Sequence, residues 1–183
     1  ISTLWIDYAP VINGEARKQI LDFVAAGGNL IIGLDREDYL VTLRNLEGKV
    51  DLLRQLGLTG SLQWVFREDT ATLDGVQLRM LNRVVTGAPG QVLARFSNGE
   101  PAVLELSYGQ GKVLVLLGEV ALASSGGLRN VLESWGGITP VVNTPARRLA
   151  VAARCSEDGY YVMAYYKPED HGGREYSQEE LDA

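Results

Sequence analysis

The sequence predicts an α/β protein with a mostly parallel sheet and flanking helices, followed by a small antiparallel β region. Three stretches lead to this prediction. Within residues 15–35 a helical pattern stops at a glycine pair and continues as an apolar strand, and residues 112–119 form the most hydrophobic run. Such runs are typical of parallel strands that are buried on both faces. Residues 149–166 hold two strand-like segments around a polar turn, which indicates a hairpin.

The N-terminal part begins as a βαβ unit. Residues 3–8 are expected to form a strand, which ends before a proline that biases the chain away from helix. The helix that follows has one apolar face, formed by Ala16, Ile20, Phe23 and Val24. Asn13 is suited to cap this helix, and Glu15 places a negative charge at its positive end.

Glycines delimit the next elements. The pair at residues 27–28 ends the first helix, because glycine adopts the left-handed conformation that caps a last turn, and residues 30–34 then form a buried strand. Residues 35–38 read as a polar corner. A second helix is predicted from Lys49 to Gln55, and Gly57 ends it.

The middle of the chain carries signals for β-structure. Residues 62–80 alternate in short pieces around an acidic turn, and we expect an inserted hairpin or loop there. Segments 92–96 and 102–106 flank Asn-Gly at residues 98–99, which is a strong hairpin signal. A tight turn at residues 108–111 then leads into the hydrophobic run, which is our candidate for the central strand.

The C-terminal part divides into two regions. A helix over residues 128–135 completes an α/β domain that we assign to residues 1–142. Residues 143–183 are assigned to the start of a C-terminal β region with a loose polar tail. Its predicted hairpin joins strands at residues 149–154 and 160–166 through a Ser-Glu-Asp-Gly turn.

Composition limits the classes of function. The chain has 17 Lys and Arg against 23 Asp and Glu, a formal net charge of -6, which argues against a surface for nucleic acid or anionic membranes. No apolar run is long enough to span a bilayer, so we expect no membrane insertion and a soluble protein, either cytoplasmic or secreted. The chain opens at Ile1 with a strand already under way, from which we expect a fragment of a longer protein.

Catalytic motifs are missing from the sequence. It has no nucleophile elbow, no P-loop and no G-x-G-x-x-G between a strand and a helix, so we expect no catalytic residue and no cofactor. Cys155, the single cysteine, excludes an internal disulfide and reads as a structural thiol. His171, the single histidine, reads as a solvated loop residue. The Ser-Ser-Gly-Gly at residues 124–127 reads as a helix cap rather than as an anion site.

Three carboxylates form the candidate ligand site: Asp7, Asp35 and Glu119. Each stands at or near the carboxyl end of a predicted parallel strand, where open α/β sheets bind ligands. Together they could bind sugar hydroxyls, or Mg²⁺ or Ca²⁺ through oxygen ligands. We favour the alternative that they cap helices or pair with Arg36 or Arg129, and we assign no metal site. The tryptophans could stack on sugars, although core or edge positions are more usual for them: Trp5, Trp64 and Trp135.

Two segments resemble a known domain. Residues 20–34 run from a helix through Ala-Gly-Gly into an apolar strand, and residues 90–119 contain VLARF, GEPA and YGQGKV. With the leucine-rich helix at residues 49–58 between them, they are similar to the glutamine-amidotransferase-like domain that follows the catalytic barrel in glycoside hydrolase family 42 β-galactosidases. The resemblance spans residues 3–166.

The resemblance implies a flavodoxin-like, class I glutamine amidotransferase-like fold that lacks the amidotransferase nucleophile, takes part in trimerisation and precedes a small β domain. The family's catalytic glutamates belong to a barrel outside this sequence. We therefore expect a non-catalytic structural or oligomerisation domain of a larger carbohydrate-active, β-galactosidase-like protein. Its expected partners are the catalytic domain of the parent chain and further copies in a homo-oligomer. The alternatives are a ligand- or sugar-binding module, a hydrolase that uses the acidic rim formed by Asp7, Asp35 and Glu119, or a ligand-sensing domain of a membrane-associated or secreted protein.

Overall fold

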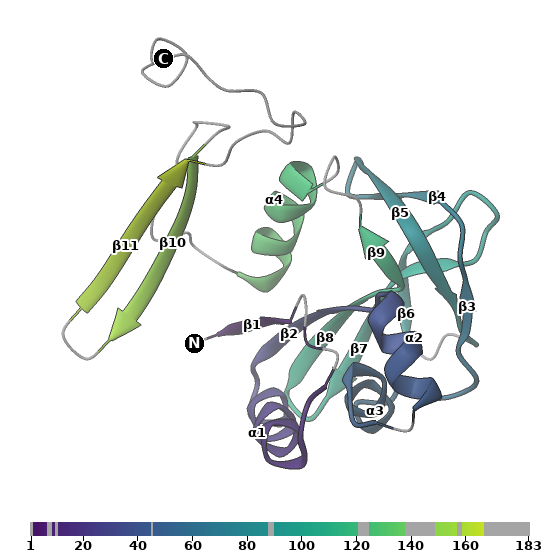
Figure 1. The fold of residues 1–183 in the computed structure, drawn as a ribbon, viewed down its shortest axis with the longest axis horizontal. Coiled ribbons are helices and arrows are strands. Elements are labelled where there is room, and N and C mark those ends of the chain that lie inside the picture. The colour runs from purple at the N-terminus through teal and green to yellow at the C-terminus, as the bar shows by residue number, and fades with distance from the viewer. Residues whose placement is uncertain are drawn as a thin grey trace, which may run out of the picture. The chain divides into compact units, whose positions relative to one another are not determined.

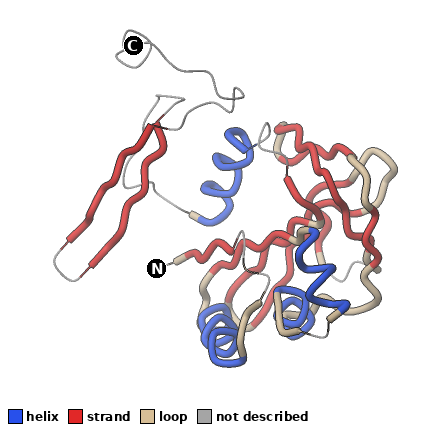
Figure 2. Tube along the Cα trace, viewed as in Figure 1, coloured by secondary structure: helices blue, strands red, loops and turns tan. Residues whose placement is uncertain are grey.

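The computed structural model describes residues 2–6, 9, 11–44, 46–87, 90–120, 125–137, 149–156 and 159–166. The chain divides into two compact units, residues 1–138 and 139–183, and each unit is considered by itself. Figure 2 distinguishes their helices, strands and loops. The domain boundary that we placed after residue 142 stays a prediction.

The first sheet has five strands in the order β1-β2-β8-β7-β6. Their bounds are Thr3–Ile6 for β1, Asn29–Gly33 for β2, Gln91–Arg95 for β6, Pro101–Tyr108 for β7 and Gly111–Leu116 for β8. β8 is the central strand, as predicted. The predicted hairpins are also confirmed, because β6 pairs antiparallel with β7 and β7 pairs antiparallel with β8.

The prediction of a mostly parallel sheet is wrong. Only β1–β2 and β2–β8 are parallel pairs within the first sheet, so this sheet is mixed. The reason lies in the connections: β6, β7 and β8 follow one another through short turns, whereas a parallel pair needs a crossover of a dozen or more residues. The sequence signals for these two hairpins already excluded a parallel arrangement of the three strands.

A second sheet is entirely antiparallel. It consists of β3 (Gln63–Val65), β4 (Asp69–Leu73), β5 (Val76–Val85) and β9 (Gly118–Val120), and β5 pairs with each of the other three. β4 and β5 are joined at Asp74–Gly75, where the backbone φ angles are 47° and 78°, a left-handed conformation that aspartate and glycine tolerate. The inserted hairpin predicted at residues 62–80 is therefore present, and its second strand extends to Val85.

The described residues of the first unit form four helices: α1 (Gly14–Ala25), α2 (Arg36–Leu43), α3 (Lys49–Gln55) and α4 (Ser125–Gly136). The Asn13 cap is confirmed, since its side chain accepts a hydrogen bond of 2.9 Å from the Ala16 amide. α3 has the predicted bounds. The polar corner predicted at residues 35–38 is instead the cap and first turn of α2. The Asp35 side chain accepts hydrogen bonds from the free amides at the start of this helix.

The first sheet is covered on both faces. The side chains of β2 and β8 point alternately into two hydrophobic cores, one on each face. Figure 1 shows α1 and α3 on one side of the sheet and α4 on the other. The side chains that pack with α1 and α3 are Leu30, Ile32, Val113 and Val115. Those that pack with the second sheet and α4 are Ile31, Leu114 and Leu116. This double burial explains the unbroken apolar runs in both strands, residues 30–32 and 113–116.

The second unit contains the predicted hairpin. β10 (Leu149–Ser156) pairs antiparallel with β11 (Gly159–Tyr166), in a register that opposes Leu149 to Tyr166 and Ser156 to Gly159. The predicted loose tail, which includes His171, and the side chain of Cys155 lie outside the described residues. Among the helices of the described part, none is long and apolar enough to cross a membrane.

Candidate functional site

A cavity of about 720 Å³ lies where β2 and β8 end, and two of the predicted site residues, Asp35 and Glu119, line it. Asp7 lies outside the described residues. The walls come from β1, the β2–α2 junction, β5, the end of β8, β9 and α4. They are formed by Trp5, Gly33, Leu34, Asp35, Arg36, Glu37, Leu81, Asn82, Leu116, Gly118, Glu119, Val120 and Leu128. The carboxyl edge of the sheet is thus hollowed, as expected for a site in an α/β fold.

Asp35 is held by structural contacts. Its Oδ1 accepts hydrogen bonds from the amides of Glu37 (2.8 Å) and Asp38 (3.3 Å), while the Asp35 amide donates to Asp38 Oδ2 at 2.9 Å. These reciprocal bonds form a capping box at the start of α2. Its Oδ2 accepts a hydrogen bond of 2.9 Å from Lys49 Nζ. The cap that we favoured from sequence is present, and the cation beside it is Lys49 rather than Arg36.

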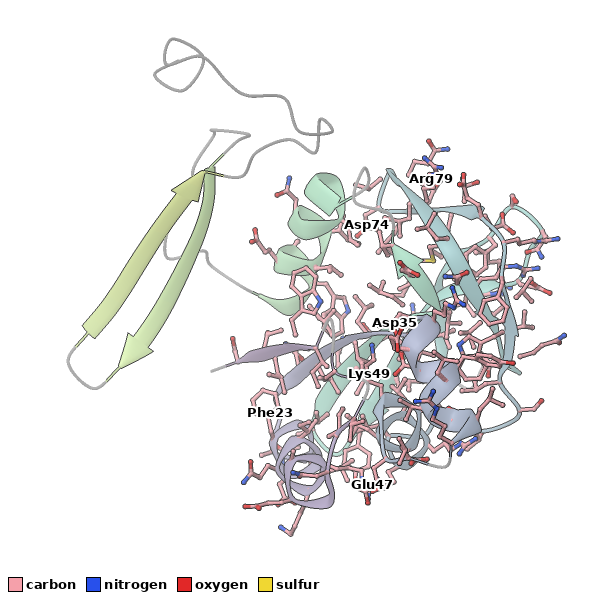
Figure 3. All side chains as sticks on the ribbon, viewed as in Figure 1. Phe23, Asp35, Glu47, Lys49, Asp74 and Arg79 are labelled. Carbon is pink, nitrogen blue, oxygen red and sulfur yellow. The ribbon has the colours of Figure 1, made fainter. Side chains whose placement is uncertain are left out.

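Lys49 joins two helices through a buried ion triad, which sequence reasoning missed. Its Nζ lies 2.9 Å from Asp35 Oδ2 and 3.1 Å from Asp38 Oδ2, and the side chains of Lys49 and Asp38 are both 0% exposed. Figure 3 shows Asp35 and Lys49 side by side. Helical spacing held the missing signal: Lys49 precedes Leu53 by four residues and Leu56 by seven, which places it on the buried face of α3.

Burial governs the pKa of Asp38. Loss of solvent raises the pKa of this carboxyl to about 6, and the opposing attraction of Lys49 does not cancel the effect. Oδ1 of Asp38 is buried and has no hydrogen-bond partner among the described residues. Since the pKa in the folded protein exceeds the unfolded value, the folded state binds more protons across the interval between them, and stability falls as the pH rises through it.

We expect Asp38→Asn to remove this pH dependence. Relative to the variant, the unmodified chain should lose about 3 kcal/mol of stability between about pH 4 and pH 6, since one pKa unit corresponds to about 1.4 kcal/mol. Urea denaturation at several pH values measures the difference. Asp74→Asn, in the exposed β4–β5 turn, is the control. Parallel stability curves for the Asp38→Asn variant and the unmodified chain would contradict the prediction.

The sequence predicted that Glu119 ends the central strand, but Glu119 lies in β9. The chain leaves β8 at Leu117, whose amide donates to the Ala102 carbonyl at 2.9 Å, and then pairs with β5 in the second sheet. Oε2 of Glu119 accepts a hydrogen bond of 2.8 Å from Asn82 Nδ2. Glu119 therefore reaches the cavity from the second sheet.

The three tryptophans have different surroundings. Trp5, on β1, lines the cavity and is 42% exposed. Trp64 packs on Tyr39, with 5.6 Å between ring centroids. Trp135, on α4, donates a hydrogen bond of 2.7 Å from Nε1 to Glu105 Oε2. Trp5 is therefore the only tryptophan of the described residues that lines this cavity.

The cavity presents groups that bind by hydrogen bonding. Carboxylates and the Asn82 amide meet there beside apolar side chains, and such a mixture orients small molecules. Within the described residues, no group of three or more His, Cys, Asp or Glu side chains is arranged to hold a metal ion. The groups that line the cavity can accept hydrogen bonds from a bound molecule and donate hydrogen bonds to it.

The fold of this chain is similar to a part of the fold of the GH42 β-galactosidases. The β-galactosidase from Bacillus circulans sp. alkalophilus is 19% identical, with a TM-score of 0.64, and the match covers 88% of this chain and 26% of the enzyme. Gan42B from G. stearothermophilus is 16% identical, with a TM-score of 0.61 and coverages of 88% and 25%. The enzyme from Rahnella sp. R3 is 17% identical, with a TM-score of 0.61 and coverages of 84% and 25%.

No family model and no curated protein sequence matches the chain. At the identities found, the likeness to the solved enzymes is one of fold. The chain spans about a quarter of the length of these enzymes.

Proposed function

We propose that these residues form a non-catalytic domain of a larger, β-galactosidase-like glycoside hydrolase, and that the domain packs against the catalytic domain or a neighbouring subunit. The observation that carries the proposal is the structural role of Asp35. Asp35 caps α2 and binds Lys49, so its carboxylate is occupied in holding the fold. The fold likeness to about a quarter of each β-galactosidase supports the same role.

An apolar surface formed by α2, β3 and Phe66, which directly follows β3, also supports a packing role. Tyr39 and Phe66 stack edge to face at 5.0 Å, and Tyr39 also contacts Trp64. Leu43, one helical turn after Tyr39, is 62% exposed, and Phe66 is 51% exposed. Large apolar side chains that gather on a surface favour a protein contact, because covering them removes apolar area from water.

We expect the full-length protein that contains these residues to be a trimer, as the family resemblance implies. Size-exclusion chromatography with light scattering measures the assembly mass, and the double variant Leu43→Asp with Phe66→Asp should lower it because charges at a contact lose solvation. Val11→Asp, at a 56% exposed position before α1, is the control. A monomeric full-length protein would contradict the oligomer claim.

A second candidate function is ligand binding at the acidic rim, either as a binding module or as a hydrolase. The observation that favours it is the cavity, which combines Trp5, Glu119 and Asn82 in one hollow. Its size falls within the range of about 300–1,000 Å³ that is usual for small-molecule sites. Calorimetric titration with simple sugars, Mg²⁺ and Ca²⁺ tests this candidate.

A further inference from the structure

We propose that the cavity binds a neutral carbohydrate, which stacks on Trp5 and forms hydrogen bonds with Asn82, Glu119 and Arg36. This inference rests on the second candidate function, ligand binding, and is independent of the packing role. It assigns a ligand class to the cavity and adds residues from three elements to the acids identified from sequence.

The apolar part of the cavity suits the face of a sugar ring. Trp5 and Leu81 are 42% and 37% exposed, and both line the cavity. They stand on opposite sheets, β1 and β5, so the cavity has apolar side chains from two directions. An indole ring has a negative face that attracts the partly positive C–H groups of a sugar ring. Covering these side chains with a ligand would also remove apolar surface from water.

The polar part of the cavity suits the hydroxyl groups of a sugar. Asn82 and Glu119 are already joined by their hydrogen bond of 2.8 Å, which fixes the direction of both side chains. Among the described residues, Oε1 of Glu119 has no hydrogen-bond partner, so it remains an acceptor. The amide oxygen of Asn82 is a further acceptor, and Arg36 brings guanidinium donors. A hydroxyl group both donates and accepts, so adjacent hydroxyls suit this alternation of donors and acceptors.

The charge of the cavity lining disfavours anionic ligands. The lining contains three acids, Asp35, Glu37 and Glu119, and one base, Arg36. Lys49 offsets part of this negative charge through its bond to Asp35, but Asp38 shares the same ammonium group. The lining is therefore net negative, which disfavours phosphates and carboxylates by repulsion. A neutral ligand that uses both donors and acceptors fits this lining better than an anion does.

Titration of the 183-residue chain with galactose, glucose, mannose and lactose tests the proposal, with calorimetry and tryptophan fluorescence as readouts. We expect at least one sugar to bind saturably. Trp5→Ala and Asn82→Ala should each raise its dissociation constant about tenfold or more, which is a loss of about 1.4 kcal/mol. Phe66→Ala, which removes an exposed aromatic ring outside the cavity lining, should leave the constant unchanged.

The outcomes separate this inference from the candidate function on which it rests. Binding of Mg²⁺, Ca²⁺ or inorganic phosphate, with none of the four sugars bound, would overturn the carbohydrate assignment and leave ligand binding in place. No binding of any probe would overturn both. Sugar binding that is unaffected by Trp5→Ala and Asn82→Ala would place the sugar elsewhere and overturn the site. Trp5→Leu, which keeps an apolar side chain, replaces Trp5→Ala if the latter does not fold.

Discussion

Replacing Lys49 with methionine is expected to lower the free energy of unfolding by about 3–5 kcal/mol, because it leaves two carboxylates at a buried site without their cation. Asp38 is 0% exposed and Asp35 is 19% exposed, so water cannot replace the ammonium group at both oxygens. The loss should appear in urea denaturation as a lower midpoint with little change in slope. Methionine keeps most of the side-chain volume, which separates the effect of charge from that of packing.

Two further variants test this explanation. Lys18→Met removes a lysine of an exposed ion pair with Asp22, whose side chains are 78% and 65% exposed, and it should change stability little. Adding Asp38→Leu to Lys49→Met should recover part of the loss, since an apolar pair no longer leaves a buried charge unpaired. Equal effects of Lys49→Met and Lys18→Met would show that the triad does not stabilise the fold.

Gly111→Ala is expected to cost about 3 kcal/mol of stability, through overpacking rather than loss of an interaction. A β-carbon at Gly111 would overlap the carbonyl oxygens of Val24 and Gly28, which belong to the end of α1 and the turn after it. Both neighbours are backbone, so no side chain can move aside. The start of β8 would have to separate from α1, and the hydrogen bond of 3.0 Å from the Gln110 amide to the Ala25 carbonyl would lengthen.

Gly14→Ala is the matched control, because nothing lies within 4 Å of a β-carbon at that position. Gly14 opens α1, where alanine favours helix, so this variant should be neutral or slightly stabilising. Thermal unfolding followed by circular dichroism compares the two variants. A Gly111→Ala variant that is as stable as Gly14→Ala would mean that the close approach of α1 and β8 is not needed for the fold.

Local sequence signals predicted most of the elements. The Asn13 cap, α3 and the β6–β7, β7–β8 and β10–β11 hairpins are confirmed, because caps, glycines and turn residues act within a few neighbouring residues. α2 was not predicted as a helix, although Asp35 was favoured as a helix cap. Asp35-Arg36-Glu37-Asp38 has the composition of a loop, and only the reciprocal bonds of Asp35 and Asp38 identify it as a capping box.

The candidate site was predicted in part. Asp35 and Glu119 were expected to lie at one edge of the sheet because parallel strands end together, and both do line one cavity. The route to Glu119 was different, since the chain passes through Leu117 into the second sheet before reaching it. Asn82 and Leu81 could not be foreseen, because β5 reaches the cavity through pairing with β9, and such pairing between distant segments leaves no local pattern.

The sequence by itself determined where this chain turns, which strands are buried and that no familiar catalytic motif is present. Glycines 27 and 28 end α1, and glycines 109 and 111 flank a tight turn, for reasons that lie in each segment alone. Only the tertiary structure showed that these two glycine-rich segments pack on each other, with Gln110 bonded to Ala25. Likewise, only the tertiary structure placed the charge of Lys49 between Asp35 and Asp38. Both contacts join residues through the packing of separate elements, and that packing depends on the whole set of buried surfaces at once.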